Sequence, residues 1–457
     1  MRSNIIAFFL LIVSTLKATD KLQTPPMGWN SYNCYGATVT EAEVKANADF
    51  MAAHLNHLGW EYIVIDYCWF YPHPAGLNNP PQNAKYQPRL AMDEYGRLLP
   101  ALDRFPSAAN GKGFKPLADY IHSKGLKFGI HVMRGIPRQA VQVDNAPVLG
   151  ATVKARDIAD TSSVCSWLNS MYGVDISKQG AQEYYNSLFK LYAEWGVDYV
   201  KVDDLLHVTG WGTPEQTVHY YKEELVAIRK AIDNCGRPMV FSQSPGNNAP
   251  VQEAVFLKEH TNLWRISMDF WDEWESLKAQ FTLAAKWAPH IGPGHWPDAD
   301  MLQLGKLSRR GPNGAERDSR FTPAEAKTHV TLWAIARSPL MFGGDLSIIR
   351  NDTYRLITNK AVIQVNQNSS NNRQLFRRGN HVAWMADVPD SRDKYLALFN
   401  LGEDADTPVY VMLAEAGITE KCAIQELWSG RNVGEFENDF YPNIPPHDAA
   451  LYRVSPR

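Results

Sequence analysis

Two apolar segments of the chain end in acidic side chains whose type and placement could support acid–base chemistry. Residues 198–206, DYVKVDDLL, contain the adjacent carboxylates Asp203 and Asp204, and residues 264–271, WRISMDFW, contain Asp269. In a parallel sheet covered on both faces, strands read as continuous apolar runs, so a carboxylate marks the point where such a strand ends. Charges at the carboxyl end of a buried strand more often belong to a site than to the core.

A pair of carboxylates in one site suits glycoside hydrolysis, in which one side chain is the ionised nucleophile and the other is the protonated acid. Lys201 and Asp203 are two residues apart on one strand, so both side chains point the same way. The neighbouring cation would keep the pKa of Asp203 low. Arg265, Ser267 and Asp269 would also share a side if their segment is extended. Each Asp alone could equally be a helix N-cap, but the whole set favours catalysis.

The elements that must position these residues alternate between strands and helices. Strand-like runs begin at Tyr62, Lys127, Asp198, Pro238 and Asn262, with amphipathic stretches between them. Capping boxes and glycine C-caps mark the helices. The boxes are Thr40 with Glu43, Thr213 with Gln216 and Thr322 with Glu325, and the glycines lie in HLGWEY, HSKGLKF, EWGVDY and NCGRPM. This alternation predicts an α/β fold with a parallel sheet, either a closed eightfold barrel or an open doubly wound sheet.

Two observations favour the (β/α)8 TIM barrel. No G-x-G-x-x-G turn follows the first strand, so the dinucleotide-binding open sheet lacks its characteristic motif. Polar residues also follow many different strands, and a barrel gathers such strand ends around one mouth. We therefore expect one site that contains Asp66, His131, Arg134, Asp203, Ser244, Asp269 and Asp300.

The chain divides into three parts. Residues 1–18 resemble a secretory signal peptide, with one positive charge, the apolar stretch IIAFFLLIV and a small residue, Ala18, before the cleavage point. Residues 19–366 form the predicted barrel. Residues 367–457 read as short alternating strands with turns, which predicts a C-terminal antiparallel β-sandwich domain. Its expected role is to pack beside the barrel, and a sugar-binding role is the less favoured alternative.

Composition narrows the partners and cofactors. The net charge of −3 and the lack of a Lys/Arg run give no sign of nucleic-acid binding. None of the five Cys has C-x-x-C spacing, and His54 with His57 fits a solvated helix face, so we expect no metal and no cofactor. After signal cleavage no further run approaches membrane length, which predicts a periplasmic or secreted protein. Cys34 and Cys68 end neighbouring strands, and a bridge between them is one expectation.

The motifs as a set resemble glycoside hydrolase family 27, the α-galactosidase and α-N-acetylgalactosaminidase family of retaining enzymes. They are TPPMGWNSYN, YIVIDYCW, DYVKVDD, WRISMDFWDEW, PDADML and the V-I-x-V-N-Q segment around Val362, and they run from about Thr24 to the C-terminus. The resemblance implies a barrel followed by a β domain, with Asp203 as nucleophile and Asp269 as acid/base. It also implies that Lys201 and Arg265 bind sugar hydroxyls and that Asp300 and Met301 line the pocket.

The chain departs from the family pattern at several specificity positions. The family usually reads I-D-D-C-W, where two Asp hold the 4- and 6-hydroxyls of galactose, and here Tyr67 replaces the second of them after Asp66. Tyr32 stands where a Trp wall is usual, and His131 stands where a Tyr is common. Ser244 lies near the place of the family's Glu that reads the 2-position. A long polar insertion, roughly residues 135–176, includes Trp167 and Tyr172.

These features predict a retaining, exo-acting α-glycosidase, most simply an α-galactosidase, whose partner is a terminal sugar. The two catalytic carboxyls are expected about 5–5.5 Å apart, because a wider gap would admit a water and give inversion. An α-N-acetylgalactosaminidase is an alternative, since Ser244 leaves room for an acetamido group. A third is a β-L-arabinopyranosidase, since Tyr67 suits a sugar without a 6-hydroxyl. A non-catalytic sugar-binding protein is disfavoured because both Asp203 and Asp269 are present.

Overall fold

The structure is a computed structural model that describes residues 22–74, 89–165, 167–209, 217–244, 249–404 and 407–457. The predicted signal peptide therefore lies outside the described residues. No helix in these ranges is both long enough and apolar enough to cross a membrane. The same ranges contain no group of three or more His, Cys, Asp or Glu side chains arranged to hold a metal ion.

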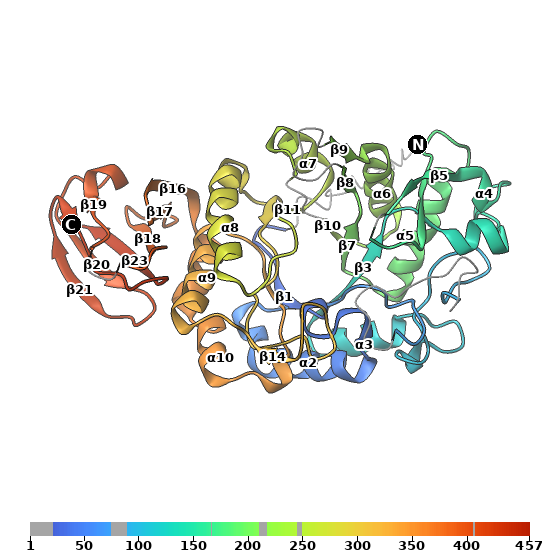
Figure 1. Ribbon diagram of the computed structural model, residues 1–457, viewed down its shortest axis with the longest axis horizontal. Coiled ribbons are helices and arrows are strands. Elements are labelled where there is room, and N and C mark those ends of the chain that lie inside the picture. Colours follow the sequence, from blue (N-terminus) through green and yellow to red (C-terminus); the bar gives the residue numbers. More distant parts are fainter. Residues whose placement is uncertain (1–21, 75–88, 166, 210–216, 245–248, 405–406) are drawn as a thin grey trace, which may run out of the picture.

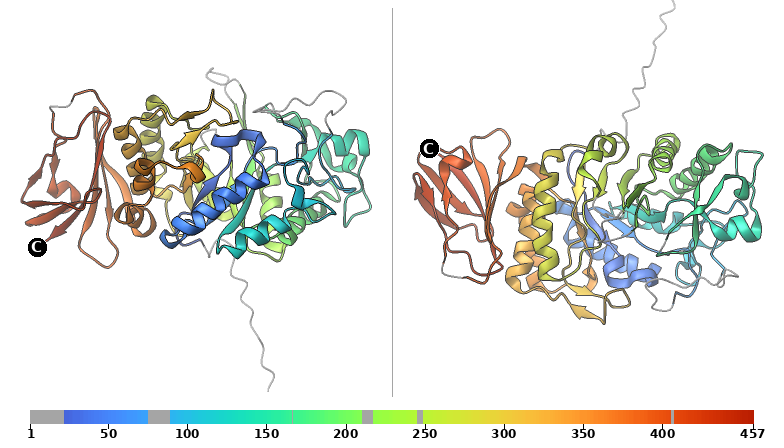
Figure 2. Two further views of the ribbon diagram at one scale, coloured as in Figure 1. Left: turned by 90° about the horizontal axis from the view of Figure 1, so that it is seen from below. Right: turned by 45° about the horizontal axis from the view of Figure 1, so that its top comes forward.

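The first domain is a parallel barrel, as predicted, and its strands follow one another around the sheet in chain order (Figures 1 and 2). All neighbouring pairs are parallel, and Leu302, just beyond the seventh strand, bridges in parallel to Phe342 on the eighth. The apolar sequences of the barrel strands are buried on both faces of the sheet, as a helix-covered sheet requires. The strands are β1 (Met27–Asn30), β2 (Tyr62–Ile65), β3 (Lys127–Met133), β7 (Tyr199–Asp203), β10 (Val240–Gln243), β11 (Leu263–Arg265), β12 (Trp296–Asp298) and β15 (Leu340–Phe342).

Helices surround these strands (Figure 2), and several of them begin or end at the predicted capping signals. The Thr40–Glu43 and Thr322–Glu325 capping boxes are both present. The Thr213–Gln216 pair lies outside the described residues, but no helix continues from it, because Thr217–Tyr220 is a strand and the next helix begins at Lys222. Gly59, Gly125, Gly196 and Gly236 all adopt positive φ, as predicted for helix C-caps. The helices are α1 (Tyr32–Tyr35), α2 (Glu41–His54), α3 (Lys115–Ser123), α5 (Ala181–Trp195), α6 (Lys222–Asn234), α7 (Ala254–His260), α8 (Trp274–Trp287), α9 (Pro323–Ile335), α10 (Asn351–Ile357) and α11 (Lys360–Asn368).

The C-terminal domain is antiparallel, as predicted, and has a separate apolar core. Its main sheet has the order β16-β17-β18-β23-β20-β21, and β19 pairs with β22 beside it. Helix α11 ends at Asn368 and β16 starts at Ser370, slightly beyond the predicted boundary. The strands are β16 (Ser370–Arg378), β17 (His381–Asp387), β18 (Lys394–Asn400), β19 (Val411–Met412), β20 (Cys422–Glu426), β21 (Asn432–Phe436), β22 (Asp439–Phe440) and β23 (Ala449–Pro456).

The insertion after β3 folds into its own small antiparallel sheet, with the order β4-β6-β5. It lies at the opposite end of the molecule from the C-terminal domain (Figure 1). Its elements are β4 (Ile136–Pro137), α4 (Ala155–Ile158), β5 (Ala159–Val164) and β6 (Met171–Val174). Two short hairpins complete the barrel loops, β8 (Leu206–Thr209) with β9 (Thr217–Tyr220) and β13 (Lys306–Leu307) with β14 (Arg317–Asp318).

The expected bridge between Cys34 and Cys68 is absent. All five cysteines lie in the described ranges, and all are free thiols. Both residues are buried, but they face different neighbours: Cys34 lies beside Arg309 and Asp345, whereas Cys68 lies beside Tyr67 and Arg104. Cys34 lies in α1, which follows β1, and Cys68 lies in the turn after β2, so the two thiols have different surroundings although the strands are neighbours.

Candidate active site

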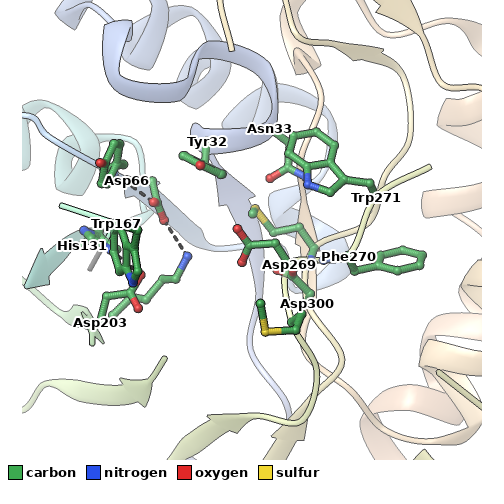
Figure 3. Close-up of a pocket in the computed structure, with 14 residues that line it drawn as sticks. Tyr32, Asn33, Asp66, His131, Trp167, Asp203, Asp269, Phe270, Trp271 and Asp300 are labelled. Carbon is green, nitrogen blue, oxygen red and sulfur yellow. Dashed lines mark hydrogen bonds and ion pairs between the residues drawn. The ribbon is translucent and has the colours of Figure 1, made fainter. Parts of the chain in front are cut away.

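A pocket of about 340 Å³ opens at the carboxyl ends of the barrel strands. Figure 3 shows Asp66, His131, Trp167 and Asp203 on one side and Asp269, Phe270, Trp271 and Asp300 on the other. Parallel strands place their carboxyl ends around one mouth, which is why residues far apart in the chain meet here. The lining residues are Tyr32, Asn33, Asp66, Tyr67, His131, Trp167, Lys201, Asp203, Met268, Asp269, Phe270, Trp271, Asp300 and Met301.

Most of the predicted site residues line this pocket, and three do not. The two predicted catalytic carboxylates, Asp203 and Asp269, face the same cavity from β7 and from the loop after β11. The predicted binding residues that also line it are Tyr32, Asp66, Tyr67, His131, Lys201, Asp300 and Met301. Arg134, Ser244 and Arg265 are buried outside the lining, and the contacts of each explain why.

Asp203 ends β7 and is held by two neighbours. Its Oδ2 lies 3.0 Å from Nε2 of His131, and its Oδ1 accepts a hydrogen bond of 2.8 Å from the backbone N–H of Asp204. Burial alone would raise the pKa of Asp203, but the hydrogen bond and charge of His131, together with Lys201, hold this pKa below its ordinary value. Asp203 is therefore kept ionised, as a nucleophilic carboxylate must be.

The ion pair of Lys201 differs from the one expected. Its Nζ lies 3.0 Å from Oδ2 of Asp66, so its direct partner is Asp66, and it lowers the pKa of Asp203 only through longer-range attraction. Asn30 donates a hydrogen bond of 2.7 Å to the same Asp66 oxygen, and the backbone N–H of Tyr67 donates one of 2.9 Å to the other. Despite its burial, these contacts lower the pKa of Asp66, which therefore stays an ionised hydrogen-bond acceptor.

Arg265 lies behind Asp269 and Asp300 and holds both of them. One guanidinium nitrogen, Nη2, lies 3.3 Å from Oδ1 of Asp269 and 2.7 Å from Oδ2 of Asp300. The segment from Arg265 to Asp269 is not extended, because β11 ends at Arg265 and the chain turns there, so the condition for these side chains to share one side is not met. Arg265 is 2% exposed, whereas the Asp269 side chain is 57% exposed and projects into the cavity.

Asp269 has the opposite electrostatic setting from Asp203. Desolvation within the pocket raises its pKa, repulsion from Asp300 and Asp203 adds to the shift, and attraction by Arg265 and Lys201 does not cancel it. One carboxyl group of the pair is thus biased toward the ionised form and the other toward the protonated form. Such a separation of pKa values is what we expect if Asp203 is the nucleophile and Asp269 is the acid.

Arg134 points away from the cavity, contrary to the prediction that it binds substrate. Its Nε donates a hydrogen bond of 2.6 Å to the backbone carbonyl of Asp204, and its Nη2 lies 3.1 Å from the Asp204 carboxylate. Its Nη1 lies 2.7 Å from Glu224, and the guanidinium stacks 3.4 Å above the ring of Tyr221. Arg134 is therefore the centre of a buried ion cluster directly behind the nucleophile strand.

Ser244 also lies outside the pocket. It directly follows β10, its backbone N–H donates a hydrogen bond of 2.9 Å to the carbonyl of Val202, and its own carbonyl accepts one of 3.4 Å from Leu205. These contacts fix the strand end beside β7. Its side chain is buried and does not line the cavity, which does not fit the predicted contact with the 2-position of a sugar.

Comparison with known proteins identifies the family to which the chain belongs. A model described as "Alpha galactosidase A" matches residues 24–141 and 172–368, and one described as "Alpha galactosidase C-terminal beta sandwich domain" matches residues 378–454. The chain belongs to glycoside hydrolase family 27. It is accordingly a glycoside hydrolase, and a carbohydrate is its substrate.

The relatives of the chain within family 27 are named for different glycosidase activities. The chain is 28% identical to an α-galactosidase of Cyamopsis tetragonoloba, over 95% of this chain and 87% of that protein. A family 27 β-L-arabinopyranosidase of Geobacillus stearothermophilus, solved as a variant in complex with arabinose, is 48% identical and covers 97% of this chain and 100% of its own, with a TM-score of 0.89. A Bacillus halodurans structure described as a candidate α-N-acetylgalactosaminidase is 47% identical over 96% and 99%, with a TM-score of 0.83.

Sequence reasoning missed several residues of this family 27 pocket. Asn33 follows Tyr32, and Met268 and Phe270 flank Asp269, so neighbouring positions already carried a signal. Trp271 ends the same WRISMDFW motif, and Trp167 stood out only as an aromatic residue within the insertion. No strand-end pattern identifies Trp167, because it lies in the loop between β5 and β6 of the insertion and not at the end of a barrel strand.

Aromatic rings form the wall next to Asp66. The ring of Tyr67 lies 5.8 Å from that of Tyr32, 6.0 Å from that of His131 and 6.0 Å from that of Trp167, measured between centroids. Tyr67 is only 4% exposed. A tightly packed aromatic ring therefore occupies the position where family 27 commonly has a second carboxylate.

Proposed function

We propose that this protein is a retaining, exo-acting β-L-arabinopyranosidase. The observation that carries the proposal is the place of Tyr67, which is buried among aromatic rings in the pocket wall beside Asp66. β-L-Arabinopyranose has the ring and hydroxyl configuration of α-D-galactopyranose but carries only hydrogens at C5. A pocket that lacks the second carboxylate and is filled by a phenol ring suits the sugar that has no 6-hydroxyl to bind.

The polar side chains beside Tyr67 suit the hydroxyls that arabinopyranose and galactopyranose have in common. Asp66 is ionised and paired with Lys201 at 3.0 Å, so both an acceptor and a donor are available for the axial 4-hydroxyl and its neighbour. A site that is built to hydrogen-bond a hydroxyl discriminates strongly between substrates, whereas an apolar wall does so only by its shape. We therefore assign recognition of the common hydroxyls to Asp66 and Lys201, and exclusion of a C6 group to Tyr67.

Similarity supports the same choice. The chain is 48% identical along its length to the Geobacillus stearothermophilus β-L-arabinopyranosidase, compared with 28% to the Cyamopsis tetragonoloba α-galactosidase. An α-galactosidase, which the sequence motifs put first, remains the second candidate because Asp66 and Lys201 would also hold galactose. We rank this candidate second because Tyr67, which lines the pocket and packs against Tyr32, stands at the position where an acceptor for the 6-hydroxyl would be expected.

In the glycosylation step, the Asp203 carboxylate attacks the anomeric carbon on the face opposite the leaving group. The bond from that carbon to the glycosidic oxygen breaks, and Asp269 gives its proton to the departing oxygen. The lowered pKa of Asp203 and the raised pKa of Asp269 prepare both groups for these roles. Arg265 holds Asp269 at 3.3 Å, and the carboxylate that remains after proton transfer is stabilised by this cation.

In the second step a water molecule attacks the anomeric carbon of the glycosyl-enzyme, and Asp269 takes up its proton as the general base. The bond to Asp203 breaks and frees the nucleophile with both of its hydrogen bonds intact. Two displacements at one carbon return the original configuration, so the sugar leaves as the same anomer. Retention of this kind requires the two carboxyls to be about 5–5.5 Å apart.

The proposal is tested with a panel of p-nitrophenyl glycosides that includes β-L-arabinopyranoside, α-D-galactopyranoside and N-acetyl-α-D-galactosaminide. We expect the arabinopyranoside to give the highest kcat/KM, the galactopyranoside a lower one and the N-acetylated sugar the lowest. The highest kcat/KM on either of the other two sugars would refute the assignment.

A further inference from the structure

The part of the chain that the family model passes over delivers a residue to the pocket. The model matches residues 24–141 and resumes at residue 172, so residues 142–171 have no counterpart in it. This segment contains β5 and ends at the first residue of β6, and the loop between these two strands carries Trp167, which lines the active-site cavity. An insertion that contributes a wall residue is placed to alter which sugar fits.

The insertion is fixed firmly to the barrel at its return strand, β6. The backbone N–H of Val174 donates a hydrogen bond of 3.2 Å to Glu224, which also lies 2.7 Å from Arg134. Gly135, at a φ of +89°, lies so close to β6 that a Cβ there would be 1.9 Å from the carbonyl oxygen of Tyr172. The buried ion cluster around Arg134 thus joins the insertion to the strand that carries the nucleophile.

Trp167 meets the rest of the wall through Tyr67. The two ring centroids are 6.0 Å apart with planes inclined by 38°, and Tyr67 also contacts His131 edge-on at 6.0 Å. Trp167, His131 and Asp203 lie on the same side of the pocket, across from Asp269 (Figure 3). Tyr67 is therefore enclosed by rings, and the ring of Trp167 limits the directions in which it could move aside for a larger sugar.

We propose that Trp167 is a specificity-determining residue that holds Tyr67 in place and, with it, closes the space that the C6 group of a hexopyranoside would need. This inference rests on the proposed function and adds a second residue to it, one supplied by the insertion. It follows that Tyr67→Asp alone opens the wall incompletely, because Trp167 still borders the vacated space. A hexose fits fully only when both Tyr67 and Trp167 are replaced by smaller side chains.

The experiment compares kcat/KM for p-nitrophenyl β-L-arabinopyranoside and p-nitrophenyl α-D-galactopyranoside in the full-length enzyme and its variants. We expect Trp167→Ala to lower the arabinoside-to-galactoside ratio by about tenfold or more, a change typical of reshaping an apolar pocket. Trp167→Phe should keep most of the ratio. Tyr67→Asp combined with Trp167→Ala should lower the ratio further than either change alone.

Leu149→Ala is the matched control, since Leu149 is an apolar, 38% exposed residue of the same insertion that does not line the pocket. Its ratio should equal that of the wild type. If the wild type prefers the arabinoside and Trp167→Ala leaves the ratio unchanged, with both rates falling together or neither changing, the role of Trp167 is refuted and the proposed function stands. A wild type that prefers the galactoside would overturn both.

Discussion

Nε2 of His131 lies 3.0 Å from Oδ2 of Asp203, so the predicted nucleophile is held by a side chain from the neighbouring strand. The two residues are brought together by the register of β3 and β7, in which His131 pairs with Lys201. Side chains two residues apart on a strand share a face, so Lys201 and Asp203 both turn toward the cavity where His131 lies. The imidazole, rather than Lys201, is therefore the direct partner of Asp203.

Replacement of His131 by Phe should reduce kcat by about tenfold to a hundredfold, because a hydrogen bond to a charged group contributes about 1.5–3 kcal/mol. The change should also raise the pKa of Asp203, since His131 lowers it, and so move the acidic limb of the kcat/KM profile to higher pH. His131→Tyr, which restores the residue common in family 27, should recover part of the activity. A His131→Phe enzyme with an unchanged profile would contradict this role.

The two carboxylates should respond differently to neutral substitution. Asp203→Asn should abolish formation of the glycosyl-enzyme with every substrate, because no nucleophile remains. Asp269→Asn should reduce hydrolysis of natural glycosides strongly but spare substrates with activated leaving groups, which need no proton. Mass spectrometry of the trapped intermediate and rates on two leaving groups would check both expectations. Equal losses on both leaving groups in Asp269→Asn would count against its role as the acid.

Asp204 should make stability depend on pH. Burial, together with repulsion from Asp203 and Glu224, raises the pKa of Asp204 from 3.8 to about 7, although attraction by Arg134 lowers it. Between these two values the folded protein holds the proton more tightly than the unfolded chain does, so this group's contribution to stability falls as the pH rises. The melting temperature of Asp204→Asn relative to the wild type should therefore increase from about pH 4.5 to about pH 7.5. A constant difference across this range would contradict the assignment.

The free thiols lead to a simple chemical prediction. Denaturation without reductant should expose five titratable thiols, and a reducing agent should leave the melting temperature unchanged. The intact protein should also keep the same mass on reduction. Two fewer thiols together with a mass gain of about two hydrogens would show that a bridge forms, because disulfide formation removes one hydrogen from each sulfur.

The sequence predicts the barrel and the catalytic pair because both depend on local signals. Apolar runs that end in carboxylates, together with capping boxes and C-cap glycines, mark the strands, the helices and the strand ends that become the site. Asp66, Asp203 and Asp269 were identified in this way, and all three line the cavity. The carboxyl ends of the barrel strands face one mouth, so a polar residue at such an end usually lies at the cavity.

Residues whose role depends on distant packing could not be predicted in this way. Arg134 follows a barrel strand as a site residue would, but its guanidinium is drawn behind β7 by Asp204 and by Glu224 on α6. Trp167 reaches the pocket from the loop between β5 and β6 of the insertion, and the pairing of these strands is not encoded by strand–helix alternation. Contacts between residues far apart in the chain determine where both side chains lie, and no residue spacing in the sequence indicates these contacts.

The most direct test of the proposed function is the ratio of kcat/KM for p-nitrophenyl β-L-arabinopyranoside to that for p-nitrophenyl α-D-galactopyranoside, measured in the wild type and in Tyr67→Asp. We expect the wild type to favour the arabinoside by about a hundredfold, because the 6-hydroxyl lacks a charged acceptor and meets the Tyr67 ring. Tyr67→Asp should raise kcat/KM on the galactoside about tenfold, as one charged hydrogen bond is restored. A wild type that hydrolyses the galactoside faster, with Tyr67→Asp lowering that rate, would contradict the proposed specificity.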